Sequence, residues 1–152
     1  MASKTLTPTS KVQVLIPACD GTTSIATCEV FVCYEQDFLD LDYDVPTQRK
    51  LLKIYRCDDE TTLAEICDCL AKDNLDLLCV SQSQIVSFVK QYPGLLCTGG
   101  NPNYFLIKND DQVCTATVYK GESTGELSVH LNHLNSCMFD KDSQLIVPRL
   151  SD

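Results

Sequence analysis

The sequence lacks a long hydrophobic run, and its first ten residues contain no apolar signal core. A helix that crosses a membrane needs about 20 mostly apolar residues, so we expect no membrane-spanning segment and no membrane partner. Nothing in residues 1–10 directs export, and we expect a soluble protein of the reducing cytoplasm. Internal repeats are also missing, and 152 residues most simply form one domain, 1–152. The loop at residues 98–103 is the alternative subdomain boundary.

Basic residues are few. The chain has 12 lysines and arginines against 21 aspartates and glutamates, and its formal net charge is −9. Proteins that bind nucleic-acid phosphates directly cluster lysine and arginine on one face, so we expect no direct nucleic-acid partner. The charge instead matches a basic surface on another protein. The plainer alternative is that the acidity only keeps the protein soluble.

Familiar catalytic motifs are missing as well. The chain has no G-x-S-x-G elbow, no phosphate-binding loop with its lysine and no dinucleotide fingerprint. His130, His133 and Cys137 have the side chains of zinc ligands and would share one face of a helix. The residues before them alternate as in a strand, which places His130 and His133 on opposite faces. We therefore expect no enzyme activity, no cofactor and no metal. A zinc- or thiol-dependent enzyme using these three residues is an alternative.

The ten cysteines would suggest disulfides in a secreted chain, whereas a reducing compartment keeps thiols free. Several share a phase with aliphatic neighbours: Cys28 with Val30 and Val32, Cys114 with Ala116 and Val118, and Cys67 with Leu63, Ile66 and Leu70. We interpret most of them as reduced thiols that are buried as small hydrophobic residues. Disulfides and metal binding are the alternatives.

The hydrophobic periodicity predicts an α+β fold with a mixed or antiparallel sheet. Capping-box patterns at residues 62–65 and 81–84 predict two central helices, at about residues 61–72 and 82–91. Strands are expected at residues 12–16, 25–34 and 145–147, and a C-terminal hairpin or meander at residues 104–108, 113–119 and 126–131. The pattern at residues 49–56 is ambiguous, and we interpret it as a strand because helix signals begin only after it. The run 75–80 is too short to be assigned to a strand or a helix.

The most informative stretch is residues 37–45, where carboxylates alternate with large apolar side chains and no base occurs. Side chains alternate along a strand, so one face would carry Asp40, Asp42 and Asp44 and the other Leu41, Tyr43 and Val45. We interpret this stretch as a partner-binding surface, with charge from Asp37, Asp40, Asp42 and Asp44 and apolar contact from Phe38, Leu41 and Tyr43.

The composition of this stretch also fits three other interpretations. Asp40, Asp42 and Asp44 match the first three ligand positions of a calcium loop, but the glycine and glutamate that such a loop needs are replaced by Val45 and Leu51. A charged edge strand can simply prevent aggregation. Carboxylates about 6.6 Å apart, twice the rise per residue of a strand, can also imitate a phosphate backbone.

We therefore expect a non-catalytic protein-binding protein that acts as an acidic inhibitor or adaptor and covers a basic surface of its partner. The alternative is a structural subunit or accessory protein of a larger assembly, such as a virus or phage particle or a homo-oligomer. The salt dependence of binding distinguishes these two hypotheses, because exposed charge pairs weaken as salt rises while apolar subunit contacts do not.

Overall fold

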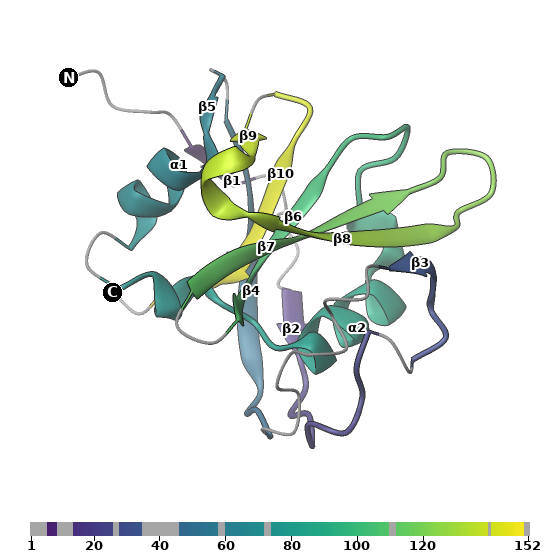
Figure 1. Cartoon of the computed structure of the whole chain (residues 1–152). Helices are drawn as coiled ribbons and strands as arrows, with labels where there is room; N and C mark the ends of the chain where they lie inside the picture. Colours follow the sequence, from purple (N-terminus) through teal and green to yellow (C-terminus); the bar gives the residue numbers. More distant parts are fainter. Residues whose placement is uncertain are drawn as a thin grey trace.

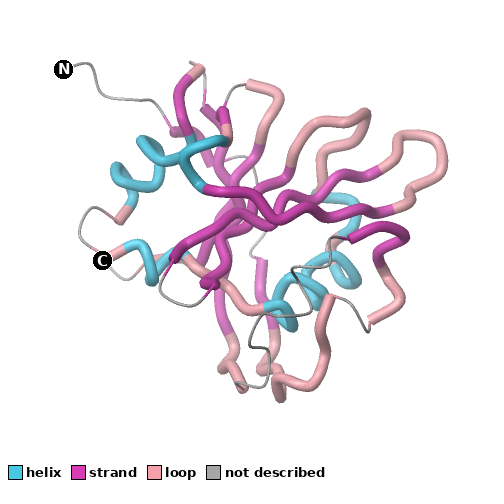
Figure 2. The backbone as a smooth tube through the Cα atoms, in the orientation of Figure 1, coloured by secondary structure: helices cyan, strands magenta, loops and turns pink. Residues whose placement is uncertain are grey.

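The computed structural model describes residues 6–8, 14–25, 28–34, 46–57, 60–71, 74–109, 112–139 and 141–150 of the chain. The fold is α+β with a mixed sheet, which confirms the sequence prediction (Figures 1 and 2). In chain order the elements are β1 (Leu6–Pro8), β2 (Val14–Ile16), β3 (Phe31–Tyr34), β4 (Lys50–Cys57), β5 (Thr61–Thr62), α1 (Leu63–Leu70), the 3-10 helix η2 (Leu75–Leu78), α2 (Gln82–Gln91), η3 (Pro93–Leu95), β6 (Asn103–Asn109), β7 (Gln112–Lys120), β8 (Leu127–His133), η4 (Leu134–Ser136), β9 (Met138–Phe139) and β10 (Gln144–Pro148).

One large sheet of eight strands runs in the order β1-β4-β10-β6-β7-β8-β3, and β2 pairs with another part of β4. Strands β6, β7 and β8 form the antiparallel meander that the sequence predicted. Strand β10 runs antiparallel to β4 and parallel to β6. Strands from both sides of the loop at residues 98–103 therefore belong to the same sheet, and β5 and β9 form a separate small one.

An α-helix covers each face of this sheet, because the central strands are apolar on both sides. On β6, Phe105 and Ile107 belong to the core that includes residues of α2. The alternate residues Tyr104 and Leu106 belong to the core that includes residues of α1. Successive side chains of a strand point to opposite faces, and all four of these side chains are buried. In Figure 1 the two helices accordingly lie on either side of the central strands.

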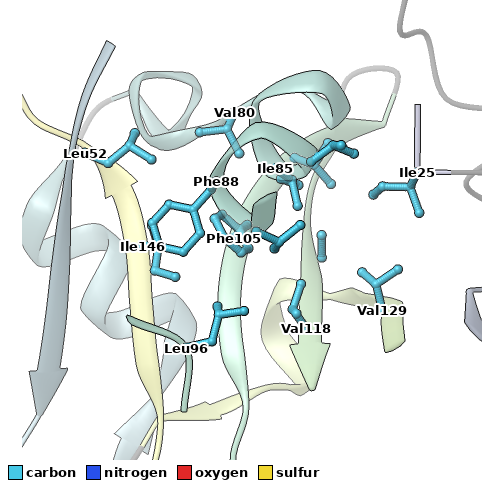
Figure 3. Packing of buried hydrophobic residues seen from close by; sticks show 14 of the residues in the cluster. Ile25, Leu52, Val80, Ile85, Phe88, Leu96, Phe105, Val118, Val129 and Ile146 are labelled. Carbon is cyan, nitrogen blue, oxygen red and sulfur yellow. The ribbon is translucent and has the colours of Figure 1, made fainter. Parts of the chain in front are cut away.

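The core beneath α2 is centred on the ring of Phe88 (Figure 3). This ring lies 5.4 Å from that of Phe105 with an interplanar angle of 74°, the edge-to-face arrangement that aromatic pairs prefer. Both rings are fully buried. Figure 3 also shows Ile146 of β10 next to Phe88, so this core joins the helix to the middle of the sheet.

Both α-helices begin at the predicted capping residues, but only one capping box is complete. The hydroxyl of Ser81 accepts from the Gln84 N–H at 3.2 Å, and the Gln84 carboxamide accepts from the Ser81 N–H at 2.9 Å. The hydroxyl of Thr62 accepts from the Glu65 N–H at 3.3 Å. The Glu65 carboxylate instead accepts from the Thr61 hydroxyl at 2.7 Å. Capping side chains therefore bind two backbone N–H groups at the start of α2 and one at the start of α1.

The predicted strand at residues 25–34 is confirmed at Phe31–Tyr34. It is wrong at residue 25 and at residues 28–30, which are not in a strand, and residues 26–27 lie outside the described residues. Before the strand, the Cys28 N–H donates to the Ser24 carbonyl at 3.0 Å, which closes a turn. Glu29 then adopts a left-handed backbone with φ of 62°, and a left-handed residue interrupts an extended chain.

The remaining predicted elements are confirmed to within about two residues at their ends, apart from residues 12–13, which lie outside the described residues. The unassigned run 75–80 begins as η2 and continues as an isolated parallel bridge from Cys79 to Leu106. No helix in the described part of the chain is both long enough and apolar enough to cross a membrane.

Candidate partner-binding surface

The predicted binding residues all lie outside the described residues: Asp37, Phe38, Asp40, Leu41, Asp42, Tyr43 and Asp44. We call residues 37–44 the acidic strip. The structure describes the chain on both sides of it. Strand β3 precedes the strip, and Thr47 follows it with a backbone pairing to Cys19, in which each N–H donates to the other residue's carbonyl at 2.8 and 2.9 Å. The strip therefore connects two points that are fixed to the fold.

Strand β3 is the last strand of the large sheet and presents apolar side chains to solvent. It pairs in parallel with β8, with Phe31 aligned to Leu127 and Tyr34 to Val129. Phe31 is buried, whereas Val32 is 66% exposed and Tyr34 is 37% exposed. Of the four exposed large hydrophobic residues in the described chain, two thus lie in this short strand. Two residues, Glu35 and Gln36, separate this exposed apolar strand from the acidic strip in the sequence.

Sequence reasoning did not include Val32 and Tyr34 among the binding residues. The shared phase of Cys28, Val30 and Val32 does not describe the strand, because Phe31 is buried and Val32 is exposed. The left-handed Glu29 interrupts the run, so the alternation before it does not continue into the strand. The one sequence signal for this surface is its position next to the acidic strip.

The alternative zinc ligands His130, His133 and Cys137 are not brought together. The register of β8 against β7 places His130 and His133 on opposite faces of the sheet. The His130 ring packs edge-on against Tyr119, with ring centres 5.6 Å apart. The Cys137 sulfur lies 3.3 Å from the hydroxyl of Thr115. Within the described ranges, no three histidine, cysteine or acidic side chains form a group that could hold a metal ion.

Four buried or half-buried cysteines have thiols that stay protonated at neutral pH. Burial raises the pKa of Cys67 to about 12, with a smaller contribution from the charge of Asp68, and it raises the pKa of Cys79 to about 11. Burial also raises the pKa of Cys114 and of Cys137. A nucleophilic or metal-binding cysteine needs its thiolate form. These four side chains therefore contribute as small apolar groups.

The described surface has two open hollows, and neither is lined by both a cysteine and a histidine. One, of about 360 Å³, lies between the loop after β2 and one face of α2, and Cys19 and Lys90 line it. The other, of about 570 Å³, is lined by Asp76 and His133. Asp76 is paired there with Lys108, whose Nζ is 2.8 Å from the carboxylate. Neither hollow places a histidine beside a cysteine, the pair that a thiol enzyme would use.

The chain matches no family model, no curated protein and no solved structure. A function is therefore inferred from the sequence and structure of this chain alone.

The sequence that contains and follows β3 carries charge of one sign. From Glu29 to Asp44 the sequence contains six acidic residues and no base. Glu29, just before β3, has an exposed side chain. A row of like charges produces a field that attracts a basic surface and repels an acidic one. Strand β3 and its exposed apolar side chains lie within this acidic part of the sequence.

Proposed function

We propose that this protein is a non-catalytic protein-binding protein, an acidic inhibitor or adaptor that covers a basic surface of a partner protein. One observation carries the proposal: an edge strand that exposes Val32 and Tyr34 ends two residues before the acidic strip in the sequence. Exposed apolar groups next to charged ones are the usual composition of a protein-binding surface.

The two parts of this surface have different roles. The carboxylates of the acidic strip attract a basic partner and orient it, because electrostatic complementarity mainly sets the association rate and the specificity. The apolar side chains of Val32 and Tyr34, together with Phe38, Leu41 and Tyr43 of the strip, supply buried area and hence affinity. A partner with basic residues around an apolar patch would satisfy both.

The proposal is tested by affinity capture from an extract of the source organism or its host. The bait is the wild-type protein or a triple variant, Asp40→Asn, Asp42→Asn and Asp44→Asn. The matched control has the same change in charge at exposed acids elsewhere: Glu60→Gln, Glu122→Gln and Glu126→Gln. A partner that the first variant loses and the control retains is the expected result. Binding of the purified partner should also weaken as salt rises above about 0.15 M.

Three other outcomes bear on the proposal. A partner retained equally by all three baits would place the interface outside the acidic strip. A partner lost equally by both variants would show attraction by net charge alone. Recovery of the bait without any partner, together with self-association that tolerates salt, would favour a subunit of a larger assembly.

A further inference from the structure

Two places in the sequence have the charge pattern of a substrate for an acid-directed protein kinase, in which a carboxylate follows the target hydroxyl at the third position. They are Thr62 with Glu65 and Ser123 with Glu126. A kinase selects its substrates in part by such patterns, because acids beside the target hydroxyl bind a basic substrate groove. The pattern is short, and the structure distinguishes the two hydroxyls.

Thr62 and Glu65 are both engaged inside the fold. The hydroxyl of Thr62 accepts from the Glu65 N–H at 3.3 Å as the N-cap of α1, and Thr62 also pairs with Met138 in the small sheet. The Glu65 carboxylate accepts from the Thr61 hydroxyl at 2.7 Å. The hydroxyl and the carboxylate that a kinase needs at this place are therefore held by contacts within the protein.

Ser123 lies in the turn that connects β7 to β8 (Figure 1). Residues 122–126 are all exposed. Hydrogen bonds of other residues close the turn: the Gly121 N–H donates to the Glu126 carbonyl at 2.8 Å, and the Glu126 N–H donates to the Thr124 hydroxyl at 3.2 Å. A group attached to the Ser123 hydroxyl therefore leaves these bonds in place.

The charge beside Ser123 is acidic on both sides. Glu122 precedes it and Glu126 follows it at the third position, and both side chains are exposed. Lys120 is the nearest base in the sequence. Its Nζ donates to the Pro93 carbonyl at 2.8 Å, which holds it against the chain that follows α2. A kinase that approaches this turn therefore meets carboxylates.

We propose that Ser123 is a phosphorylation site for an acid-directed serine/threonine kinase. This inference goes beyond the proposed binding function and does not depend on it. The Ser123 Oγ forms a bond to the γ-phosphorus of ATP as the bond from that phosphorus to ADP breaks, and the hydroxyl proton passes to the catalytic base of the kinase. The product has about 1.5 to 2 additional negative charges at neutral pH. Because the turn is exposed, the thermal midpoint should stay within about 2 °C of the unmodified protein.

Phosphorylation of the whole folded chain tests this assignment. The kinase is one that requires an acid at the third position after its target, supplied with magnesium and ATP, and mass spectrometry locates the phosphate. We expect about one phosphate per chain, at Ser123. Ser123→Ala should abolish the modification. Ser136→Ala is the control, because this exposed serine is followed at the third position by Phe139, and modification should be unchanged.

A pair of charge variants tests which acid directs the kinase. Glu126→Gln removes the carboxylate at the third position and should lower kcat/KM for phosphorylation of Ser123 by about tenfold. Glu122→Gln changes the net charge by the same amount beside the same serine, and it should lower kcat/KM by less than about threefold. Both side chains are exposed, so neither change disturbs the core.

Synthetic peptides centred on Thr62 and on Ser123 test whether the fold selects the site. Outside the fold both have the charge pattern, and the kinase should modify them at rates within about threefold of each other. In the folded chain Ser123 should be modified and Thr62 should not. Equal modification of the two residues in the folded chain would overturn the argument from exposure, and an unmodified Ser123 peptide would overturn the argument from charge.

Other results would also overturn the inference. Equal effects of Glu126→Gln and Glu122→Gln would mean that the acid at the third position does not direct the kinase. Modification at the same rate by a kinase that requires a base before its target would mean that Lys120 directs it. Ser123 should also become phosphorylated in an extract of the source organism or its host, and an unmodified Ser123 there would overturn the assignment. None of these results bears on a partner that depends on the acidic strip.

Discussion

The carboxamide of Gln144 donates a hydrogen bond to Oδ1 of Asn103 at 2.8 Å, across the parallel strands β10 and β6. Both side chains are buried. Asn103 also accepts from the Cys97 N–H and donates to the carbonyls of Cys97 and Val118. Gln144 donates in addition to the carbonyl of Leu95 at 2.7 Å. These two carboxamides tie the chain that follows α2 to the middle of the sheet.

Asn103→Asp should lower the free energy of unfolding by about 3 kcal/mol, because it places a carboxylate oxygen against the carbonyls of Cys97 and Val118 in a buried site. Urea denaturation at pH 7 measures this loss. Burial raises the pKa of such a carboxyl, so the deficit should shrink as the pH falls and the group becomes protonated. The exposed Asn135→Asp is the control, with a change below about 0.5 kcal/mol. Equal effects of the two substitutions would contradict a buried network.

Tyr92→Phe should destabilise the protein by about 1–3 kcal/mol, because it leaves both the N–H and the carbonyl of Leu15 without the hydroxyl partner. Amide exchange of Leu15 should become faster, while thermal denaturation reports the loss of stability. Tyr34→Phe is the matched control, since that side chain is 37% exposed, and its stability should stay near that of the wild type. Unchanged exchange at Leu15 in Tyr92→Phe would show that the hydroxyl does not bind these backbone groups.

Ser81→Ala should cost more stability than Thr62→Ala, because Ser81 belongs to a complete capping box and Thr62 accepts a single longer bond. We expect a loss of about 1–2 kcal/mol for Ser81→Ala and of about 0.5–1 kcal/mol for Thr62→Ala. Denaturation followed by circular dichroism measures both losses. The reverse order would mean that the Glu65 contact to Thr61 stabilises its helix as well as a complete box does.

The thiol of Cys67 should make the protein less stable in alkaline solution. Burial raises its pKa from 9.0 to about 12, so above pH 9 the unfolded chain loses this proton and the folded chain keeps it. A group with a raised pKa contributes stability that is complete below pH 9 and disappears as the pH rises toward 12. The slope is at most about 1.4 kcal/mol per pH unit.

Denaturation of wild type and Cys67→Ala between pH 8 and about pH 11 tests this expectation. The variant should be less stable at pH 8, because alanine leaves a small cavity, and the difference should narrow as the pH rises. Cys69→Ala is the control, because its side chain is exposed and the pH dependence should stay that of the wild type. Parallel curves for Cys67→Ala and wild type would exclude the thiol as the cause.

Local patterns in the sequence predicted the elements that depend on neighbouring residues. The spacing of Ser81 and Gln84 located the start of α2, because a capping box is a contact within one turn. The antiparallel meander from residue 103 to residue 133 follows from alternation and turn residues in the same way.

The parts that sequence reasoning missed depend on residues far apart in the chain. The pairing of β10 with β4 and β6 joins segments that no local pattern connects. The exposure of Val32 was not predicted, because the alternation of its run is interrupted by the left-handed Glu29 and by a shift in the register of β3 against β8 between Phe31 and Cys33. The acidic strip remains a prediction, since residues 37–44 lie outside the described part of the chain.

The central position of β10 has a consequence for synthesis of the protein on the ribosome. Among the described strands, β10 is the one that links β4, with its neighbours β1 and β2, to the meander and β3. Residues 144–148 are translated after all of those strands. The edges of β4 and β6 that pair with β10 therefore stay unpaired until β10 has been synthesised. Pairings between such distant segments form slowly, and exposed edges in the meantime invite aggregation. A nascent chain released before residue 144 would therefore be a natural substrate for chaperones.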